Sequence, residues 1–141
     1  MHFQMVNRPI QIARGVLTPN ANSGETAPPG SGATITIYDS TAGANGLQGN
    51  PSIPFTRLVL TVKSSADGAA SGVTFEGSND NGSHWETMSA AQSYTTASGL
   101  STYDIAVTMP QARIKYANSA AVLTVWEMSL IGVIGDRAKT T

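Results

Sequence analysis

Cysteine is absent from the 141-residue sequence, which excludes disulfide bonds and thiol chemistry. This absence fits folding in a reducing cytosol without requiring it, because many exported bacterial proteins also lack cysteine. The sequence has no apolar run near the roughly 20 residues that a membrane-spanning helix needs. Residues 1–5 do not form a basic segment followed by an apolar one. We therefore expect a soluble protein without an export signal and without a membrane partner.

Charged residues are also scarce. They make up 12% of the chain, against about 25% in an ordinary soluble domain. The net charge is −1, so there is no excess of basic side chains to neutralise phosphates, and nucleic acid is not an expected partner. A surface with few charges is desolvated at low cost. The composition therefore favours a protein that is covered by neighbours, while a Ser/Thr-rich β-protein with a bland surface is the alternative.

Alternation of apolar and polar side chains predicts β-strands along most of the chain. The pattern is clearest at 56–63, where Leu58, Leu60 and Val62 share one face. It recurs at 9–17, 33–39, 73–76, 101–109, 113–117 and 121–134. No segment has the period of an amphipathic helix, and turn signals occur about every ten residues. We therefore predict an all-β protein, an antiparallel β-sandwich of jelly-roll type with about eight strands.

The inward faces of these strands predict the core. Its expected members are Leu58, Leu60, Val62, Phe75, Ile105, Val107, Val122 and Trp126. Tyr38 is expected on the outer face of its strand, with Thr34 and Thr36. Residues 89–99 are treated as irregular. Within and near this segment, Trp85 and Tyr94 are the aromatic side chains expected to be open to a ligand.

The segment Val73–Trp85 predicts a β-hairpin. Val73 and Phe75 lie on one side of its first strand, with Thr74 and Glu76 opposite. The pair at 81–82 is Asn-Gly, the residue types that adopt the positive φ angles of a tight turn. Trp85 then anchors the return strand.

Residues 75–85, FEGSNDNGSHW, resemble the EGSNDG-x-x-W hairpin of discoidin-like and related β-sandwich modules. Such modules are often longer and often carry a disulfide, which this chain cannot form. Similar stretches occur in small virion proteins of tailed bacteriophages, including capsid decoration proteins. The likeness covers roughly the second half of the chain and continues through Tyr103-Asp104-Ile105, Arg113-Ile114-Lys115-Tyr116 and Val122–Ile134.

This resemblance implies a decoration or cement protein that binds the outside of a phage capsid and reinforces the shell. Its expected partners are the major capsid protein and copies of itself, with a trimer as one form, and its expected location is the virion after assembly in the host cytoplasm. The alternative from another class is a carbohydrate- or receptor-binding β-sandwich of a tail or a secreted protein. Exposed aromatic side chains on one face would favour that alternative.

Candidates for catalysis are few. The histidines are His2 and His84, so a nucleophile and base pair would need a serine beside His84 and a carboxylate such as Asp80 or Glu86. The strained Gly-x-Ser-x-Gly turn that presents a nucleophile is missing from the sequence. A surface histidine without a catalytic role explains His84 more simply. We therefore predict that the protein is not an enzyme and has no catalytic residues and no cofactor.

The polar run at 79–83 looks at first like a calcium-binding loop. With Gly82 at the sixth position of an EF-hand, Gly77 would stand where the first carboxylate belongs and Met88 where the bidentate glutamate belongs. Turn chemistry explains the run instead. We predict no metal site, with an adventitious cation at Asp80 as the alternative. The Gly-rich stretches lack the Gly-Lys-Ser/Thr of a phosphate-binding loop.

Three segments flank or interrupt the predicted sandwich of residues 9–135: an N-terminal arm (1–8), a Gly/Pro-rich loop (18–32) and a polar tail (136–141). The loop has too little apolar surface to fold alone, so we expect contacts elsewhere to order it. Alternating apolar side chains suit the arm to pairing with a neighbour's sheet edge, and a frayed start of the first strand is the alternative. The predicted partner-binding residues are Met1, Phe3, Met5, Arg8, Pro19, Pro28, Pro29 and Trp85.

Overall fold

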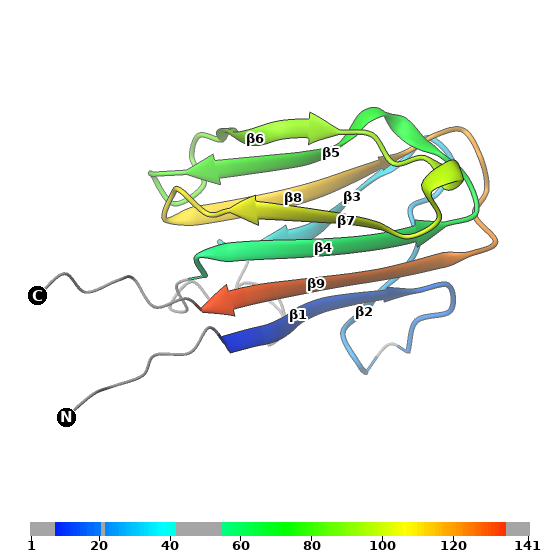
Figure 1. Ribbon diagram of the computed structural model, residues 1–141, viewed down its shortest axis with the longest axis horizontal. Coiled ribbons are helices and arrows are strands. Elements are labelled where there is room, and N and C mark those ends of the chain that lie inside the picture. The colour runs from blue at the N-terminus through cyan, green and yellow to red at the C-terminus, as the bar shows by residue number, and fades with distance from the viewer. Residues whose placement is uncertain (1–7, 21, 42–54, 135–141) are drawn as a thin grey trace, which may run out of the picture.

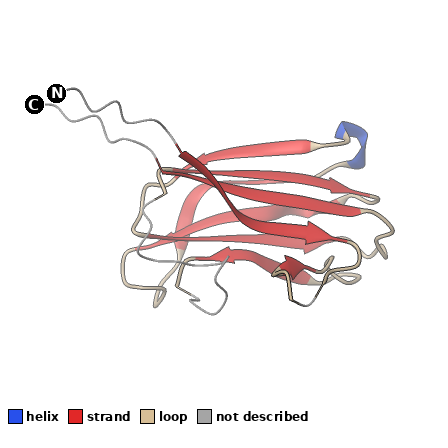
Figure 2. Ribbon diagram, turned by 90° about the horizontal axis from the view of Figure 1, so that it is seen from below, coloured by secondary structure: helices blue, strands red, loops and turns tan. Residues whose placement is uncertain are grey.

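The structure is a computed structural model that describes residues 8–20, 22–41 and 55–134 (Figure 1). Its strands form a five-stranded sheet in the order β2-β1-β9-β4-β7 and a four-stranded sheet in the order β3-β8-β5-β6. Figure 2 shows these sheets as two layers. The elements are β1 (Arg8–Val16), β2 (Glu25–Thr26), β3 (Thr34–Asp39), β4 (Arg57–Ser64), β5 (Gly68–Ser78), β6 (Glu86–Gln92), the short 3₁₀ turn η1 (Thr96–Ser98), β7 (Ser101–Ala106), β8 (Gln111–Asn118) and β9 (Trp126–Ile134).

The pairing of the long strands is nested. β5 pairs with β6, β4 with β7, β3 with β8 and β1 with β9, all antiparallel, and successive pairs belong to alternate sheets. A long double strand folded over in this way is a jelly roll, whose eight strands make two sheets. The predicted sandwich of jelly-roll type is therefore confirmed, and the two-residue β2, which pairs parallel to β1, is an addition to it.

The core lies between the two sheets. Of the predicted core residues, Leu58, Leu60, Val62, Phe75, Ile105 and Trp126 are buried, and Val107 is half-buried against them. Val122 is 80% exposed, so its prediction was wrong, whereas Leu123 is buried. The reason is that residues 121–125 form a loop and β9 begins only at Trp126, so period-two alternation does not extend back to Val122.

Tyr38 is also buried, contrary to the prediction that it faces outward. The β3–β8 pairing shifts register between Thr36 and Tyr38. Such a bulge adds one residue to a strand and changes the face to which the following side chain points. Ile37 and Tyr38 are consequently both buried in the core.

The loop 18–32 makes many of its contacts within the chain. Its residues 25–26 form β2. The side chain of Asn118, at the end of β8, donates hydrogen bonds to the carbonyl oxygens of Pro29 and Gly30, at 3.4 and 3.1 Å. Ser31 Oγ donates to the carbonyl of Ala120 at 2.6 Å. These hydrogen bonds offset part of the conformational entropy that is lost when the loop is ordered. The sequence analysis expected contacts outside the loop to do this.

The strand directions give the sandwich two ends. β1 and β4 finish, and β7 and β9 begin, at one end, where Val16 pairs with Glu127 and Ser64 with Trp126. We call this end, made of the connections 17–33, 65–67, 93–100 and 119–125, the loop end; it lies at the right of Figure 1. The opposite end carries the β5–β6 turn and the corner where Arg8 pairs with Ile134. No helix among the described residues is long and apolar enough to cross a membrane.

Candidate functional site

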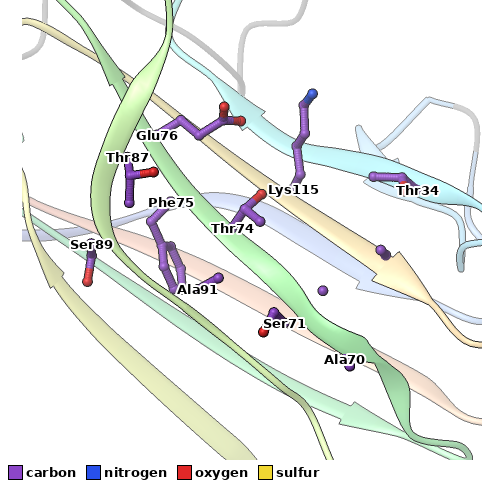
Figure 3. A pocket seen from close by; sticks show the side chains of 12 residues that line it. Thr34, Ala70, Ser71, Thr74, Phe75, Glu76, Thr87, Ser89, Ala91 and Lys115 are labelled. Atoms are coloured by element: carbon purple, nitrogen blue, oxygen red, sulfur yellow. The ribbon is translucent and has the colours of Figure 1, made fainter.

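A shallow groove of about 400 Å³ lies on the outer face of the four-stranded sheet (Figure 3). Its polar lining consists mainly of hydroxyl groups, with one ammonium and one carboxylate: Thr34, Ser71, Thr74, Thr87, Ser89, Lys115 and Glu76. Small residues form the floor. At one of them, Gly72, a Cβ atom would lie 2.7 Å from the carbonyl oxygen of Ala117, so only glycine lets β5 approach its neighbour this closely. The groove is thus a polar depression over a floor of small residues.

Two of the strands that line the groove, β5 and β8, carry side chains that alternate between core and surface. Val73 and Phe75 are buried and Thr74 and Glu76 face outward, as the sequence predicted. On β8, buried Ile114 and Tyr116 alternate with half-buried outer residues. The register then places Thr74 opposite Lys115 and Glu76 opposite Arg113. Hydroxyl, carboxylate and basic groups therefore share one outer surface.

Glu76, Arg113 and Trp85 form a closed cluster beside the groove. Arg113 Nε and Nη2 donate to the two carboxylate oxygens of Glu76, each at 3.1 Å. The guanidinium carbon of Arg113 also lies 4.2 Å from the centre of the Trp85 ring, a cation–π distance. Because the carboxylate and guanidinium satisfy each other, neither is left as a free charge for a ligand.

Lys115 differs from Arg113 in this respect. Its neighbour across the strand pair is Thr74, which carries no charge. Within the part of the chain that the structure describes, the Lys115 ammonium has no ion pair and no hydrogen bond. It is a cation among hydroxyl groups, which suits binding of a polyhydroxylated or anionic group more than acid–base chemistry.

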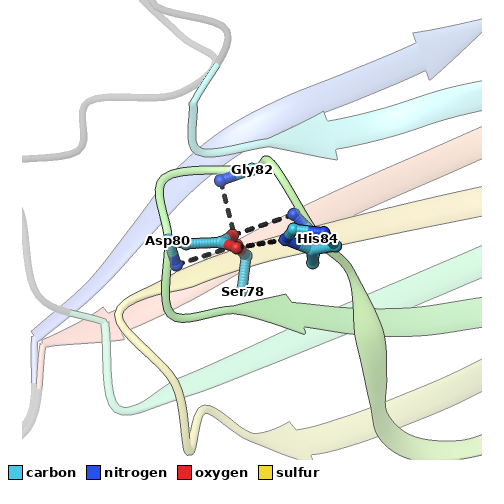
Figure 4. A network of polar contacts seen from close by, with 4 residues as sticks. All are labelled: Ser78, Asp80, Gly82 and His84. Atoms are coloured by element: carbon cyan, nitrogen blue, oxygen red, sulfur yellow. Dashed lines mark hydrogen bonds and ion pairs between the residues drawn. The ribbon is translucent and has the colours of Figure 1, made fainter.

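The β5–β6 turn is organised by Ser78, Asp80, Gly82 and His84 (Figure 4). Asn81 and Gly82 have φ angles of 58° and 90°, which confirms the predicted left-handed geometry of this turn. Ser78 Oγ donates to Asp80 Oδ1 at 2.8 Å and accepts from the Gly82 amide at 2.9 Å. Asp80 also accepts from the His84 amide at 2.9 Å and contacts His84 Nδ1 through its other oxygen. The turn is therefore closed by its own side chains.

These contacts define what the turn can do chemically. Hydrogen bonds from the side chain and amide of His84, followed by that from Ser78, lower the pKa of Asp80 to about 2. Ser78 donates to the carboxylate and not to the imidazole, so the order of contacts is not that of a nucleophile, a base and an orienting acid. Among the described residues, no group of three or more His, Cys, Asp and Glu side chains lies close enough to hold a metal ion.

The structure separates the residues predicted to bind a partner. Trp85 is half-buried beside Arg113, at the end of the sandwich opposite the loop end. Pro19 is exposed, Pro28 is half-buried, and Pro29 is buried within the chain and offers no surface to a partner. The backbone of Arg8 begins β1 and so belongs to the sandwich, while Met1, Phe3 and Met5 lie outside the described residues, as does the predicted tail, 136–141.

The prediction that Tyr94 is exposed was wrong, because its side chain is buried and only 1% exposed. Its hydroxyl accepts a hydrogen bond from the Ser64 amide at 2.9 Å and donates one to the Gly99 carbonyl at 2.7 Å. Polar neighbours at 89–99 concealed this inward position.

The groove and the Glu76–Arg113–Trp85 cluster were missed for another reason. The alternation showed that Glu76 and Arg113 face outward, but only the register of β5 against β8 brings them together.

No protein-family model matches the chain, and no curated protein sequence matches it. Among solved structures, the crystal structure of the PBSX exported protein XepA is similar, with a TM-score of 0.60 and 10% sequence identity. The similarity covers 95% of this chain and 39% of that chain, so this chain corresponds to well under half of that protein. At this identity the similarity shows a shared fold.

Proposed function

We propose that the protein is a phage-associated structural protein, a binding module that covers a surface of a larger assembly, and not an enzyme. The observation that carries the proposal is the fold similarity to the PBSX exported protein XepA, a phage protein, over 95% of this chain. The composition supports it, because a chain with 12% charged residues presents a surface that is desolvated at low cost.

The more specific form of the proposal is a decoration or cement protein on the outer surface of a phage capsid, with the major capsid protein as partner. The resemblance of the hairpin at 75–85 to small virion proteins supports this form. Arg8 pairs with Ile134, so β1 begins and β9 ends at one corner of the sandwich. A contact made by the N-terminal arm would hold this corner against the capsid.

The test uses gradient-purified phage particles and, separately, capsids prepared without the protein. We expect the protein to be present in the particles and the added full-length protein to sediment with the capsids. Absence from the particles would refute the virion proposal. Presence in particles without binding to capsids would refute the decoration proposal and leave a tail or other location.

The contribution of the N-terminal arm is tested by deleting residues 1–7. We expect weaker binding to capsids with an unchanged melting temperature, because β1 begins at Arg8. Deletion of residues 136–141 is the matched control for removal of a chain end at the same corner. Unchanged binding after the N-terminal deletion would contradict the proposed role of Met1, Phe3 and Met5.

A second candidate function is carbohydrate binding, and the groove on the four-stranded sheet favours it. Its hydroxyl groups and the unpaired ammonium of Lys115 match the hydrogen-bonding groups of a glycan. An aromatic stacking surface is less available, because Arg113 covers one face of Trp85 and Tyr94 is buried. A glycan array followed by NMR titration tests this candidate. Binding that Lys115→Ala and Thr74→Val both weaken would support it, and an array without binders would exclude it.

A further inference from the structure

The described strands give the two sheets four edges, and the edge formed by β7 differs from the other three. β3 and β6 each have an irregular register with the strand beside them. At the remaining edge, β2 is two residues long, and β1 behind it contains Pro9 and a register shift. Bulges, proline and very short strands keep an edge from pairing with another chain. β7 has none of these features, because its six residues include no proline and pair with β4 in unbroken register.

The backbone of β7 has polar groups that point away from the sheet. The Val107 amide donates to the Thr56 carbonyl at 3.0 Å, so Val107 faces β4. Neighbouring residues of a strand point their N–H and C=O groups in opposite directions, so every second residue back from Val107 also faces β4. The N–H and C=O groups of Thr102, Asp104 and Ala106 therefore face outward, where no described strand pairs with them. The side chains of these three residues are exposed as well.

A groove of about 380 Å³ lies beside this edge, between β7 and β6 of the other sheet. Its exposed lining is polar and includes Gln92 and Ser93. Its less exposed lining includes Tyr103, which is half-buried, and buried Phe75, with 6.1 Å between the two ring centres. A strand paired with β7 would point every second side chain toward this groove. The edge thus offers main-chain hydrogen bonds and the groove accepts alternate side chains, the two requirements for recognition by strand addition.

Residues 1–7 of this chain have a sequence suited to such a strand. Met1, Phe3 and Met5 alternate with polar residues at positions 2 and 4, so an extended conformation places three apolar side chains on one face. Methionine and phenylalanine both pack favourably against aromatic rings such as that of Tyr103. Residues 1–7 are also long enough to follow the six residues of β7.

The reach of these residues distinguishes their own copy from a second one. β9 and β4 separate β1 from β7 in the sheet, so a strand added beyond β7 lies four strand spacings from β1, about 19 Å. Residues 1–7 extend at most about 25 Å from Arg8, which leaves roughly two residues for pairing after that crossing. Pairing along the whole edge of β7 therefore requires residues 1–7 of a second copy.

We propose that β7 receives residues 1–7 of a neighbouring copy as an added strand, whose apolar side chains enter the groove between β6 and β7. The carboxylate of Asp104 does not stand free at this edge, because Arg57 donates to both of its oxygens at 2.9 Å. Linked copies hold a surface through several contacts at once, so this pairing adds to any contact that the arm makes with the capsid. The pairing is measured without capsids, and its failure would leave the capsid proposal standing.

The test measures self-association of the full-length protein by sedimentation velocity over a range of concentrations. We expect reversible association by the wild-type protein. Phe3→Glu places a charge on the apolar face of the arm and should weaken association by more than about tenfold. Gln4→Glu adds the same charge to the opposite face of the arm and should leave association unchanged. Both variants should keep the melting temperature of wild type, because β1 begins at Arg8.

The edge itself is tested at Thr102, whose N–H faces away from β4. Thr102→Pro removes this donor without removing a hydrogen bond to β4, so it should weaken association by more than about tenfold in a protein that still folds. Thr102→Ala keeps the N–H and is the matched control, with unchanged association. Association that Thr102→Pro leaves unchanged would overturn the proposal.

Amide hydrogen exchange, measured by NMR, locates the contact independently. We expect the amides of Thr102, Asp104 and Ala106 to exchange more slowly as the concentration of wild type rises, and not to do so in Phe3→Glu. Slow exchange of these amides at every concentration would mean that a segment of the same copy covers them, and would overturn the proposal. A wild-type protein that stays monomeric up to about 1 mM would overturn it as well. So would association that Phe3→Glu leaves unchanged, because the occupant would then be another segment, such as β7 of the second copy.

Discussion

Arg113 and Glu76 lie directly opposite each other on β8 and β5, joined by two hydrogen bonds on the outer face of the sheet. Arg57 and Asp104 have the same two-bond geometry at 2.9 Å on the other sheet. The pairs differ in exposure, which is 19% and 24% for the side chains of Arg113 and Glu76 and 47% and 51% for those of Arg57 and Asp104. Exposure, together with the contact between Arg113 and Trp85, should therefore separate the energies of the two pairs.

We expect Arg113→Ala to lower the free energy of unfolding by about 1–2 kcal/mol, because it removes a partly buried ion pair and the contact with Trp85. Arg57→Ala should lower it by about 0.5 kcal/mol or less, as exposed ion pairs contribute little. Urea denaturation of both variants measures the difference. Equal losses would mean that partial burial and the Trp85 contact add nothing.

The Tyr94 hydroxyl provides a second test. Tyr94→Phe leaves the buried amide of Ser64 without its acceptor, so we expect a loss of about 1–3 kcal/mol in the free energy of unfolding. Tyr103→Phe is the matched control, because the hydroxyl of Tyr103 makes a long contact, 3.5 Å, to the Ser93 carbonyl and satisfies no buried amide. That variant should stay within about 0.5 kcal/mol of wild type. A neutral Tyr94→Phe would show that another group satisfies the amide.

Substitution of Gly132 tests how closely the core packs against β9. A Cβ atom at this position would lie 2.6 Å from Cδ1 of Ile12 and closer still to the ring of Phe55. We therefore expect Gly132→Ala to cost about 1–3 kcal/mol through overpacking. At Gly30 the nearest atom would be the Cβ of Ala33 at 3.8 Å, so Gly30→Ala should be close to neutral. Thermal unfolding of the two variants compares them, and similar melting temperatures would contradict the close contact at Gly132.

The ionisation of Asp80 should make the stability of the protein depend on pH. Its pKa falls from 3.8 to about 2 on folding, mainly because His84 and Ser78 bond its carboxylate. A lowered pKa means that the stabilisation is complete above pH 3.8 and is lost as the pH falls through about 2. The melting temperature of wild type should therefore exceed that of Asp80→Asn by a constant amount from pH 7 to about 4, and the difference should shrink toward pH 2 and vanish below about pH 2. A difference in melting temperature that persists well below pH 2 would show that it does not arise from the ionisation of Asp80.

The fold could be predicted from the sequence because burial of one sheet face imposes a period of two on each strand. Leu58, Leu60 and Val62 follow this period without interruption, and all three are buried. Prediction failed where the period is interrupted. The bulge in β3 turns Tyr38 inward, and the loop before β9 exchanges the exposures of Val122 and Leu123. Neither irregularity has a local residue signature in this sequence.

The candidate sites were less predictable, because they depend on relations between distant segments. The turn at Asn81 and Gly82 is local, and its geometry was predicted. The groove requires the register of β5 against β8. Residue types alone also mislead for Tyr94, whose polar neighbours predicted exposure although its ring fills the core.

The nested pairing of strands determines the order in which strand pairs can form during synthesis. The innermost pair, β5 and β6, is joined by a short turn and closes its loop at small entropic cost. Each further pair must wait for a later strand, so β1, the first of the described strands to be synthesised, meets β9 only after the other described strands have emerged. Pairing of two strands so far apart in the sequence makes the topology slow to complete. Until then β1 is paired only with the two-residue β2, and an incompletely paired sheet of this kind is prone to aggregation.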